Sequence, residues 1–226
     1  PEEHNRVLTD HAADLLFCPT VIAVENLARE NIVNNVYLVG DTMFDAVLQF
    51  SELACQRSTI LERLALAPRE YILATIHRPY NTDVPENLQA VLTAFSELDA
   101  PVIFPVHPRT KKCIEQLDFT RWNGSNLRLI DPVGYLDMLV LEKNARLLMT
   151  DSGGMQKEAY FFKVPCVTLR PETEWIETVE VGWNRLAGTD TAQIVAAARG
   201  FLPQNHHPAL YGDGYAARKI VAQLAT

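Results

Sequence analysis

The chain has 226 residues, 48% of them hydrophobic and 21% charged, a composition typical of a globular protein with a substantial buried core. Its formal net charge of −8, with no stripe of lysine and arginine, argues against binding to nucleic acid. No apolar run approaches the roughly 20 residues of a membrane-spanning helix, so we expect no membrane partner.

Apolar runs and amphipathic segments alternate along the chain after a helix-like start within 1–16. The apolar runs predict β-strands over 15–18, 36–39, 71–76, 101–106, 127–130, 145–150, 165–169 and 184–188. The amphipathic segments predict helices over 21–30, 42–66, 85–98, 110–117, 135–144, 154–162, 191–202 and 214–225. This alternation favours an α/β fold, in which helices cover both faces of a doubly wound parallel sheet.

Polar residues with chemical potential follow several of the predicted strands. In parallel sheets of this kind, ligands bind beyond the carboxyl ends of the strands, so these turns are the candidate site. His77 and Arg78 follow the third strand and could bind a diphosphate or supply a proton. The alternative is a surface histidine that bonds to its own loop. His107 lies in the proline-containing turn of the fourth strand, and we interpret it as structural.

A single cation follows the predicted strand over 165–169. Arg170 could face a phosphate, or it could hold its own loop by pairing with Glu172 or Glu174. The sequence leaves both interpretations open.

The stretch TDSGGMQKEA follows the apolar run ARLLM directly. Gly153 and Gly154 would let backbone N–H groups approach a phosphate at the start of a helix. Glu158, further along the same helix, could accept hydrogen bonds from the hydroxyls of a sugar. The other interpretation is an ordinary helix cap made by Asp151 or Ser152, with glycine giving the turn.

Cysteine and histidine spacing gives no sign of a metal site. The cysteines at positions 18, 55, 113 and 166 form no CxxC motif and fit a reducing compartment, so we expect a cytoplasmic protein. His206 and His207 are adjacent in the PQNHHP loop, but no spaced third ligand accompanies them. We therefore expect neither a metal nor another cofactor.

Several long stretches keep the order and spacing of motifs known from one family. They are PEEHNRVLTDHAADLLFCPT, GDTMFDAV, HRPYN, DPVGYLDMLVLEKNARLLMTDSGGMQKEA, VPCVTLRPETEWIETVEVGWNRLAG and YGDGYAARKIVAQL. Together they resemble the UDP-N-acetylglucosamine 2-epimerase family, of the non-hydrolysing type, over nearly the whole chain.

The resemblance implies a glycosyltransferase-B-type architecture, with two Rossmann-like domains and an active site between them. Residues 1–34 would be the remnant of the N-terminal domain, 35–210 the UDP-binding C-terminal domain, and 211–226 a closing helix. Other acidic residues that the family uses would lie upstream of Pro1. We therefore expect the chain by itself to be inactive.

The activity implied by the resemblance is conversion of UDP-GlcNAc to UDP-ManNAc by elimination and re-addition of UDP, without a cofactor. The implied partner is a UDP-sugar, and family resemblance suggests a homodimer. Three alternatives remain open: a UDP-2,3-diacetamido-glucuronic acid-type 2-epimerase, a hydrolysing 2-epimerase, and a non-catalytic UDP-binding paralogue. Trp175 stands where many members have arginine, which resembles the branch with modified sugars.

The resemblance also implies roles for individual residues. Glu2 and His77 would be catalytic. The residues that would bind UDP are Ser152, Gly153, Gly154, Glu158, Met138 and Arg170. The serine and glycines would hold the phosphates, the glutamate would hold the ribose, and the methionine would contact uracil where many members place an aromatic residue.

Overall fold

The structure is a computed structural model that describes residues 2–117, 119–122, 124–203 and 206–225. It contains two compact units, one formed by residues up to Phe50 and from Pro208 onward, and the other by Ser51–His207. The sequence places its divisions at 34/35 and 210/211 instead. The assignment of segments to the domains of a two-domain protein stays a prediction.

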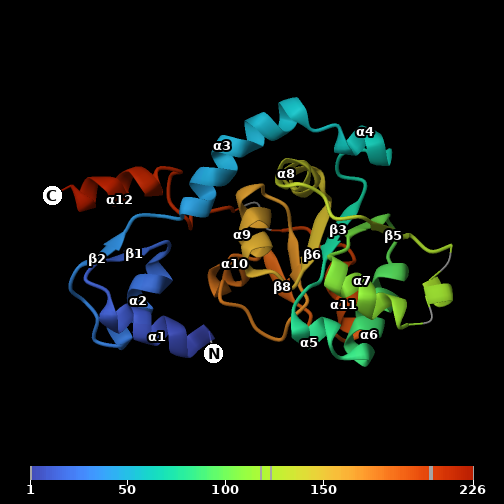
Figure 1. Cartoon of the computed structure of the whole chain (residues 1–226), viewed down its shortest axis with the longest axis horizontal. Helices are drawn as coiled ribbons and strands as arrows, with labels where there is room; N and C mark the ends of the chain where they lie inside the picture. Colours follow the sequence, from blue (N-terminus) through green and yellow to red (C-terminus); the bar gives the residue numbers. More distant parts are fainter. Residues whose placement is uncertain (1, 118, 123, 204–205, 226) are drawn as a thin grey trace. The chain divides into compact units, whose positions relative to one another are not determined.

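The larger unit is built on a six-stranded parallel sheet (Figure 1). Its strands are β3 (Ile72–Thr75), β4 (Val102–Pro105), β5 (Leu127–Ile130), β6 (Leu147–Thr150), β7 (Cys166–Thr168) and β8 (Asn184–Leu186). Their spatial order is β5-β4-β3-β6-β7-β8, and every pair is parallel. This is the Rossmann strand order, in which the direction of winding reverses between β3 and β6.

The two central strands, β3 and β6, are buried at every position. A strand covered on both faces needs apolar side chains on both, which explains the apolar runs at these positions. The parallel register pairs Ile72 with Leu147 and Thr75 with Thr150. Both strands therefore end at the same level, and the residues after them lie side by side.

Helices connect the strands of this sheet. They are α4 (Ile60–Leu64), α5 (Pro79–Thr82), α6 (Pro85–Ser96), α7 (Pro108–Glu115), η1 (Phe119–Trp122), α8 (Tyr135–Asn144), α9 (Gly153–Phe161), α10 (Ile176–Glu180) and α11 (Thr191–Ala198). The helices α5, α10 and η1 have five residues or fewer, too short for an amphipathic pattern to predict them.

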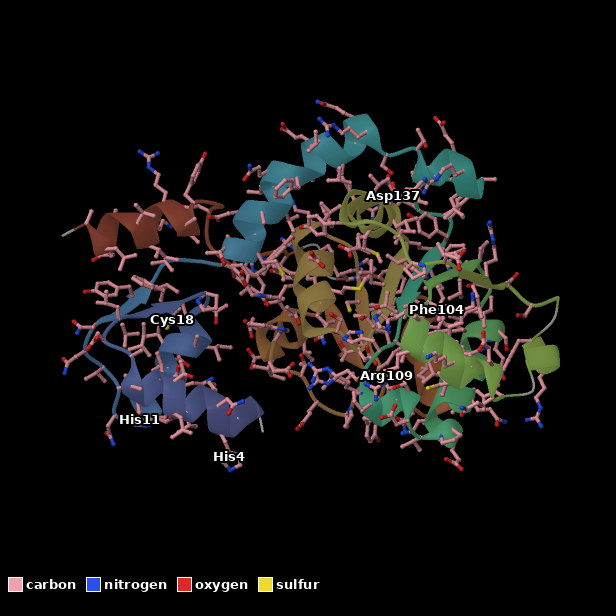
Figure 2. All side chains as sticks on the ribbon, in the orientation of Figure 1. His4, His11, Cys18, Phe104, Arg109 and Asp137 are labelled. Carbon is pink, nitrogen blue, oxygen red and sulfur yellow. The ribbon has the colours of Figure 1, made fainter. Side chains whose placement is uncertain are left out.

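The helices cover both faces of the sheet. The crossovers β3–α6–β4 and β6–α9–β7 run in opposite directions, so right-handed connections place α6 and α9 on opposite faces. Helix α11 packs against α6, whereas α8 packs against α9. Phe95 of α6 meets Phe104 of β4 edge to face, with ring centroids 6.2 Å apart (Figure 2 labels Phe104). The predicted doubly wound parallel sheet is confirmed.

The single helix predicted over 42–66 is wrong, because the chain forms α3 (Thr42–Arg57) and α4 with a break between them. In the break, the Ser58 hydroxyl accepts a hydrogen bond from the backbone N–H of Ile60 at 3.2 Å and donates one to Asp137 at 2.5 Å. Figure 2 shows Asp137 on α8. A serine that bonds to its own backbone competes with the helical hydrogen bonds and ends the helix here.

The smaller unit holds a two-stranded parallel sheet of β1 (Leu16–Cys18) and β2 (Val36–Leu38). Its helices are α1 (Glu2–Ala12), α2 (Val21–Arg29), the beginning of α3, and α12 (Ala216–Leu224). No helix in the described ranges is long and apolar enough to cross a bilayer.

Two glycines of the smaller unit let distant segments touch. Gly40 and Gly212 have φ angles of +94° and +86°, which L side chains rarely adopt. A Cβ on Gly40 would lie 2.9 Å from the carbonyl oxygen of Tyr211, and one on Gly212 would lie 2.9 Å from the Cα of Gly40. This close approach brings the start of α12 to Asp45 of α3, whose carboxylate accepts the N–H groups of residues 216 and 217.

Candidate functional site

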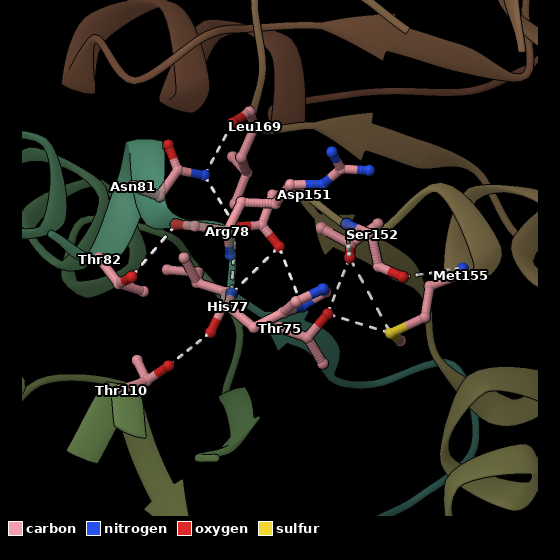
Figure 3. Close-up of polar contacts among 12 residues, drawn as sticks. Thr75, His77, Arg78, Asn81, Thr82, Thr110, Asp151, Ser152, Met155 and Leu169 are labelled. Atoms are coloured by element: carbon pink, nitrogen blue, oxygen red, sulfur yellow. Dashed lines mark hydrogen bonds and ion pairs between the residues drawn. The ribbon is translucent and has the colours of Figure 1, made fainter. Parts of the chain in front are cut away.

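The candidate site lies where the winding of the six-stranded sheet reverses. At such a point the loops after two neighbouring strands run to opposite sides and leave a crevice at the strand ends. His77 follows β3 here, and Asp151 and Ser152 follow β6 (Figure 3). The hydroxyls of Thr75 and Thr150, the last residues of the two strands, are hydrogen-bonded at 2.7 Å. The strand ends are thus tied together directly beneath the crevice.

Asp151 organises this crevice. Its side chain is fully buried, and it accepts hydrogen bonds from the backbone N–H of His77 at 3.1 Å to each oxygen and of Arg78 at 2.9 Å. The Asn81 amide donates to it at 2.9 Å and also to the carbonyl of Leu169 at 3.0 Å (Figure 3). A buried carboxylate needs such partners, and these connect the ends of β3, β6 and β7.

The His77 imidazole is held by the same carboxylate. Its Nδ1 lies 3.2 Å from Asp151 Oδ1, while half of the side chain is exposed. Because Nδ1 faces the carboxylate, Nε2 lies on the other side of the ring and stays available. The arrangement can accept or deliver a proton at the mouth of the crevice.

Helix α9 begins at the crevice. Ser152 is its N-cap: the side-chain oxygen accepts from the N–H of Met155 at 3.4 Å, and the Ser152 N–H donates to Thr150 Oγ1 at 2.9 Å. The capping interpretation of Ser152 is therefore confirmed, whereas Asp151 caps nothing and serves the β3 turn instead. Capping uses the serine as an acceptor and leaves its O–H able to donate to a ligand.

The loop before α10 closes on the first turn of α9. A Cβ on Gly153 would lie 3.2 Å from Trp175 Nε1 and 3.6 Å from Glu174 Oε2. A side chain at this position would make the loop shift by a few tenths of an ångström, so glycine favours this close approach. Gly154 follows as the second residue of the helix. The four N–H groups of a first turn have no partner within their helix and favour an anion.

Two buried carboxyl groups lie on the packed helices α8 and α9. Glu158 is 8% exposed, and its carboxylate makes no hydrogen bond within the described residues. Burial raises the pKa of Glu158, and the charge of Lys157 lowers it by less. Glu142, which is 1% exposed, has a pKa raised well above the ordinary value by burial and then by the charge of Glu158. Neighbouring buried carboxyls resist ionising together.

Two arginines meet one carboxylate beside α9. Arg170, whose side chain is only 13% exposed, donates to both oxygens of Glu174 at 2.8 and 2.9 Å. The guanidinium of Arg78 lies 3.7 Å from the same carboxylate. Of the two interpretations of Arg170, pairing with Glu174 is the one that the structure contains. The guanidinium nonetheless lies at the strand ends, beside the crevice.

A pocket of about 200 Å³ opens beside the crevice. It is lined by Thr75, Ile76, His77, Pro105, His107, Pro132, Val133, Met138 and Met155. Its walls are mainly apolar, with a few polar groups. The imidazole of His107 caps α7 by accepting from the N–H of Arg109 at 3.3 Å, so its predicted structural role is confirmed.

Most of the predicted site residues gather around this part of the larger unit. His77, Met138, the residues 152–154 and 158, and Arg170 come from the ends of β3, β6 and β7 and from the helices α8 and α9. Glu2 begins α1 in the smaller unit, and its side chain lies outside the described residues. In the described part of the chain, no three metal-ligating side chains cluster.

Sequence reasoning missed the roles of Asp151, Asn81 and Glu142. A signal existed for Asn81, which ends the HRPYN motif, and for Asp151, which was considered only as a cap. Nothing local marked Glu142, because its pattern is that of an ordinary amphipathic helix.

The strand order, the crevice and the glycine-started helix define a Rossmann-like α/β protein with its candidate site at the switch point. The family model for UDP-N-acetylglucosamine 2-epimerase matches residues 1–225. The chain belongs to that family.

Individual relatives agree with this assignment. A UDP-N-acetylglucosamine 2-epimerase homolog of Methanococcus maripaludis is 48% identical, over 99% of this chain and 64% of the relative. The UDP-2,3-diacetamido-2,3-dideoxy-D-glucuronate 2-epimerase of Pseudomonas aeruginosa is 44% identical, over 100% of this chain and 63% of the relative. The solved structure of Methanocaldococcus jannaschii UDP-GlcNAc 2-epimerase in complex with UDP-GlcNAc and UDP matches with a TM-score of 0.90 and 41% identity, covering 100% of this chain and 64% of that one.

The chain thus spans about 64% of the length of these relatives. The fold expected from the family resemblance is confirmed by the structural match across the chain.

Proposed function

We propose that this chain is the UDP-holding part of a UDP-sugar 2-epimerase that converts UDP-GlcNAc to UDP-ManNAc. The observation that carries the proposal is the crevice between β3 and β6. In a chain of this family, it brings an anion-favouring helix start and a histidine–aspartate pair to one place.

The diphosphate would bind at the start of α9. Backbone N–H groups of Gly153 and Gly154 and the hydroxyl of Ser152 point to this end of the helix, where the helix dipole favours negative charge. Arg170 supplies a guanidinium beside them. This combination lets a protein of net charge −8 bind an anion locally.

The nucleoside would extend from the diphosphate along α9 and α8. The Glu158 carboxylate, for which no hydrogen bond is seen among the described residues, would accept hydrogen bonds from the ribose hydroxyls. Met138 lines the apolar pocket and would contact uracil through its polarisable thioether.

The chemistry would proceed by elimination and re-addition. Removal of the C2 proton and cleavage of the C1–O bond release UDP and leave an unsaturated sugar. Re-addition of UDP at C1 with proton delivery to the opposite face of C2 gives the epimer. We assign a proton-handling role near the diphosphate to His77, oriented by Asp151, and a second catalytic role to Glu2. No cofactor takes part in this scheme.

Binding and turnover test the proposal separately. Titration calorimetry should detect UDP binding to the wild-type chain, and Ser152→Ala and Glu158→Ala should each weaken it about tenfold or more. In the intact protein, His77→Ala should lower kcat by roughly 100-fold or more while UDP affinity changes little. Unchanged UDP affinity in both binding variants would remove Ser152 and Glu158 from the site.

Product analysis distinguishes the related activities. The intact protein with UDP-GlcNAc should form UDP-ManNAc, whereas release of free ManNAc and UDP would identify a hydrolysing enzyme. No turnover despite UDP binding would favour a non-catalytic UDP-binding paralogue.

A second candidate substrate is a UDP-2,3-diacetamido-glucuronic acid. The 44% identity to the Pseudomonas enzyme and Trp175 beside the start of α9 favour it. Comparison of kcat/KM for the two sugars decides between them. We further propose a cytoplasmic homodimer, which light scattering of the intact protein and fractionation of cells would test.

A further inference from the structure

Glu174 lies beside the place where the proposed function puts a phosphate. Its carboxylate bridges Arg170 and Arg78, the two arginines that follow β7 and β3. One of its oxygens lies 3.6 Å from the position of a Cβ on Gly153, in the first turn of α9. The protein thus holds one of its own anions against two guanidinium groups and beside the first turn of α9.

The Glu174 side chain is ionised in this position. Burial by itself raises the pKa of Glu174, but the hydrogen bond from Arg170 and the charges of Arg170 and Arg78 lower it below the ordinary value. Its negative charge lies beside the first turn of α9, near the helix end where the dipole favours an anion. Electrostatically, the carboxylate resembles a bound phosphate group.

The loop that carries Glu174 is fastened to α9. Trp175 lies under the ammonium group of Lys157, which is 4.4 Å from the ring centroid. The hydroxyl of Thr173 donates to Gln156 Oε1 at 2.6 Å and accepts the N–H of Trp175 at 3.0 Å. These contacts flank Glu174 in sequence, so its position follows from the packing of the loop.

We propose that Glu174 is an internal competitor of the diphosphate, whose carboxylate holds the anion position until a ligand displaces it. The inference rests on the proposed function, because it places the diphosphate at the start of α9. Displacement breaks the bidentate pair with Arg170 and the contact with Arg78, so both guanidinium groups lose this competing carboxylate. The same pair re-forms when UDP leaves, which shortens the residence of UDP on the protein.

The test is whether removing the charge of Glu174 raises or lowers the affinity for a phosphate-containing ligand. Glu174→Gln keeps the size of the side chain and removes its charge, so UDP and inorganic pyrophosphate should each bind roughly fivefold or more tightly. Uridine, which has no phosphate, should bind unchanged. Glu172→Gln is the graded control: the charge of Glu172 acts on Arg170 more weakly than that of Glu174 and through no hydrogen bond, so this variant should tighten binding by less.

Each outcome decides the proposal. A purely structural role of Glu174 predicts the opposite sign, because a loosened Arg170 would bind phosphate less well. Equal or weaker binding of UDP to Glu174→Gln, with binding to the wild type intact, overturns the inference and leaves the proposed function standing. A wild-type chain that binds neither UDP nor pyrophosphate contradicts both.

A second variant keeps the test decisive if Glu174→Gln fails to fold. Glu174→Asp retains the charge but shortens the reach toward the arginines. Glu174→Asp should raise the affinity for pyrophosphate, but by less than the increase expected of Glu174→Gln. Weaker pyrophosphate binding to a folded Glu174→Asp variant would also contradict the proposal.

Discussion

Asp151 shapes the candidate site in two ways: it holds the backbone after β3 and it contacts the side chain of His77. It fixes two consecutive N–H groups after β3, and it orients the His77 ring. The backbone of the turn and the direction of the imidazole therefore depend on one carboxylate. Asn81 supports it from α5 and connects it to the end of β7.

Asp151→Asn should lower both stability and turnover. The variant replaces one accepting oxygen by an NH₂ group that faces the N–H groups of residues 77 and 78, so buried donors lose their acceptor. We expect the free energy of unfolding to fall by about 2 kcal/mol or more, as measured by chemical denaturation. Asp131→Asn, at an exposed aspartate after β5, should cost less than about 0.5 kcal/mol. Equal stability of the two variants would contradict this role for Asp151.

Ionisation of Glu142 lowers the stability of the folded protein, whereas ionisation of a salt-bridged carboxylate raises it. Its pKa is raised in the folded protein above the value of 4.5 that it has unfolded. The folded state therefore binds the proton more tightly. Its contribution to stability is complete below the unfolded pKa and is lost as the pH rises toward the folded pKa.

Glu142→Gln should remove that dependence. The melting temperature of the variant should exceed that of the wild type at about pH 8, and the two should converge near pH 4, where the wild-type carboxyl is neutral. Glu115→Gln, at an exposed glutamate on α7, should show no such pH-dependent difference. A constant offset between Glu142→Gln and wild type at all pH values would contradict the assignment.

At the scale of elements, the sequence predicts the strands, but it does not predict the long-range contacts of the residues that follow them. A buried parallel strand such as β3 or β6 is a short apolar run, so the sequence marks it locally. The position of Ser152 at the start of a helix is local too. The link from Asp151 to His77 joins residues 74 apart in sequence, and a local pattern can suggest only the capping role. The Arg170–Glu174 pair was among the predicted alternatives because the two residues are neighbours in one loop.

The helix break after α3 illustrates the same limit. The hydrophobic pattern of α3 resumes in α4 after only four polar residues, 56–59, and the sequence predicts one helix. The hydroxyl that ends α3 is engaged by Asp137, which lies 79 residues further along the chain. Tertiary contact decides the local structure there.

Gly212→Ala should destabilise the contact between the chain segments around Gly40 and Tyr211. The added Cβ meets backbone atoms at 2.9 Å, and backbone cannot move aside as a flexible side chain can. We expect a loss of more than about 2 kcal/mol, from positive φ and overlap together. Gly188→Ala has a φ of +61° but no atom within 4 Å, so it should show the conformational cost alone, about 1 kcal/mol. Equal losses in chemical denaturation would contradict the steric explanation.

At the scale of the molecule, the composition predicts a globular protein and the alternation of elements predicts an α/β fold, but neither predicts the order of the strands. Alternating strands and helices are compatible with several parallel sheets, and only the tertiary structure shows that β3 and β6 are neighbours. This adjacency makes the candidate site, since it joins the HRPYN turn to the DSGG turn. The family resemblance anticipated both turns as parts of one site.

On our proposal, the molecule binds an anion although its own net charge is negative. A formal charge of −8 repels a diphosphate at long range. Two arginines and one helix start must overcome this within a few ångströms. We expect UDP affinity to vary with ionic strength less steeply than the affinity of a basic protein for a polyanion would.

The pairing of Thr75 with Thr150 has a consequence for how this protein can change. In a parallel ladder, a shift of one residue moves a strand by about 3.3 Å and turns each side chain to the opposite face. A single deletion within β6 would therefore part Asp151 from His77, although every residue of the site would still be present. Loops beyond the strand ends can vary in length without that effect. Insertions and deletions within β3 and β6 should consequently be selected against. A chimera that exchanges one of these strands must keep its register with the other.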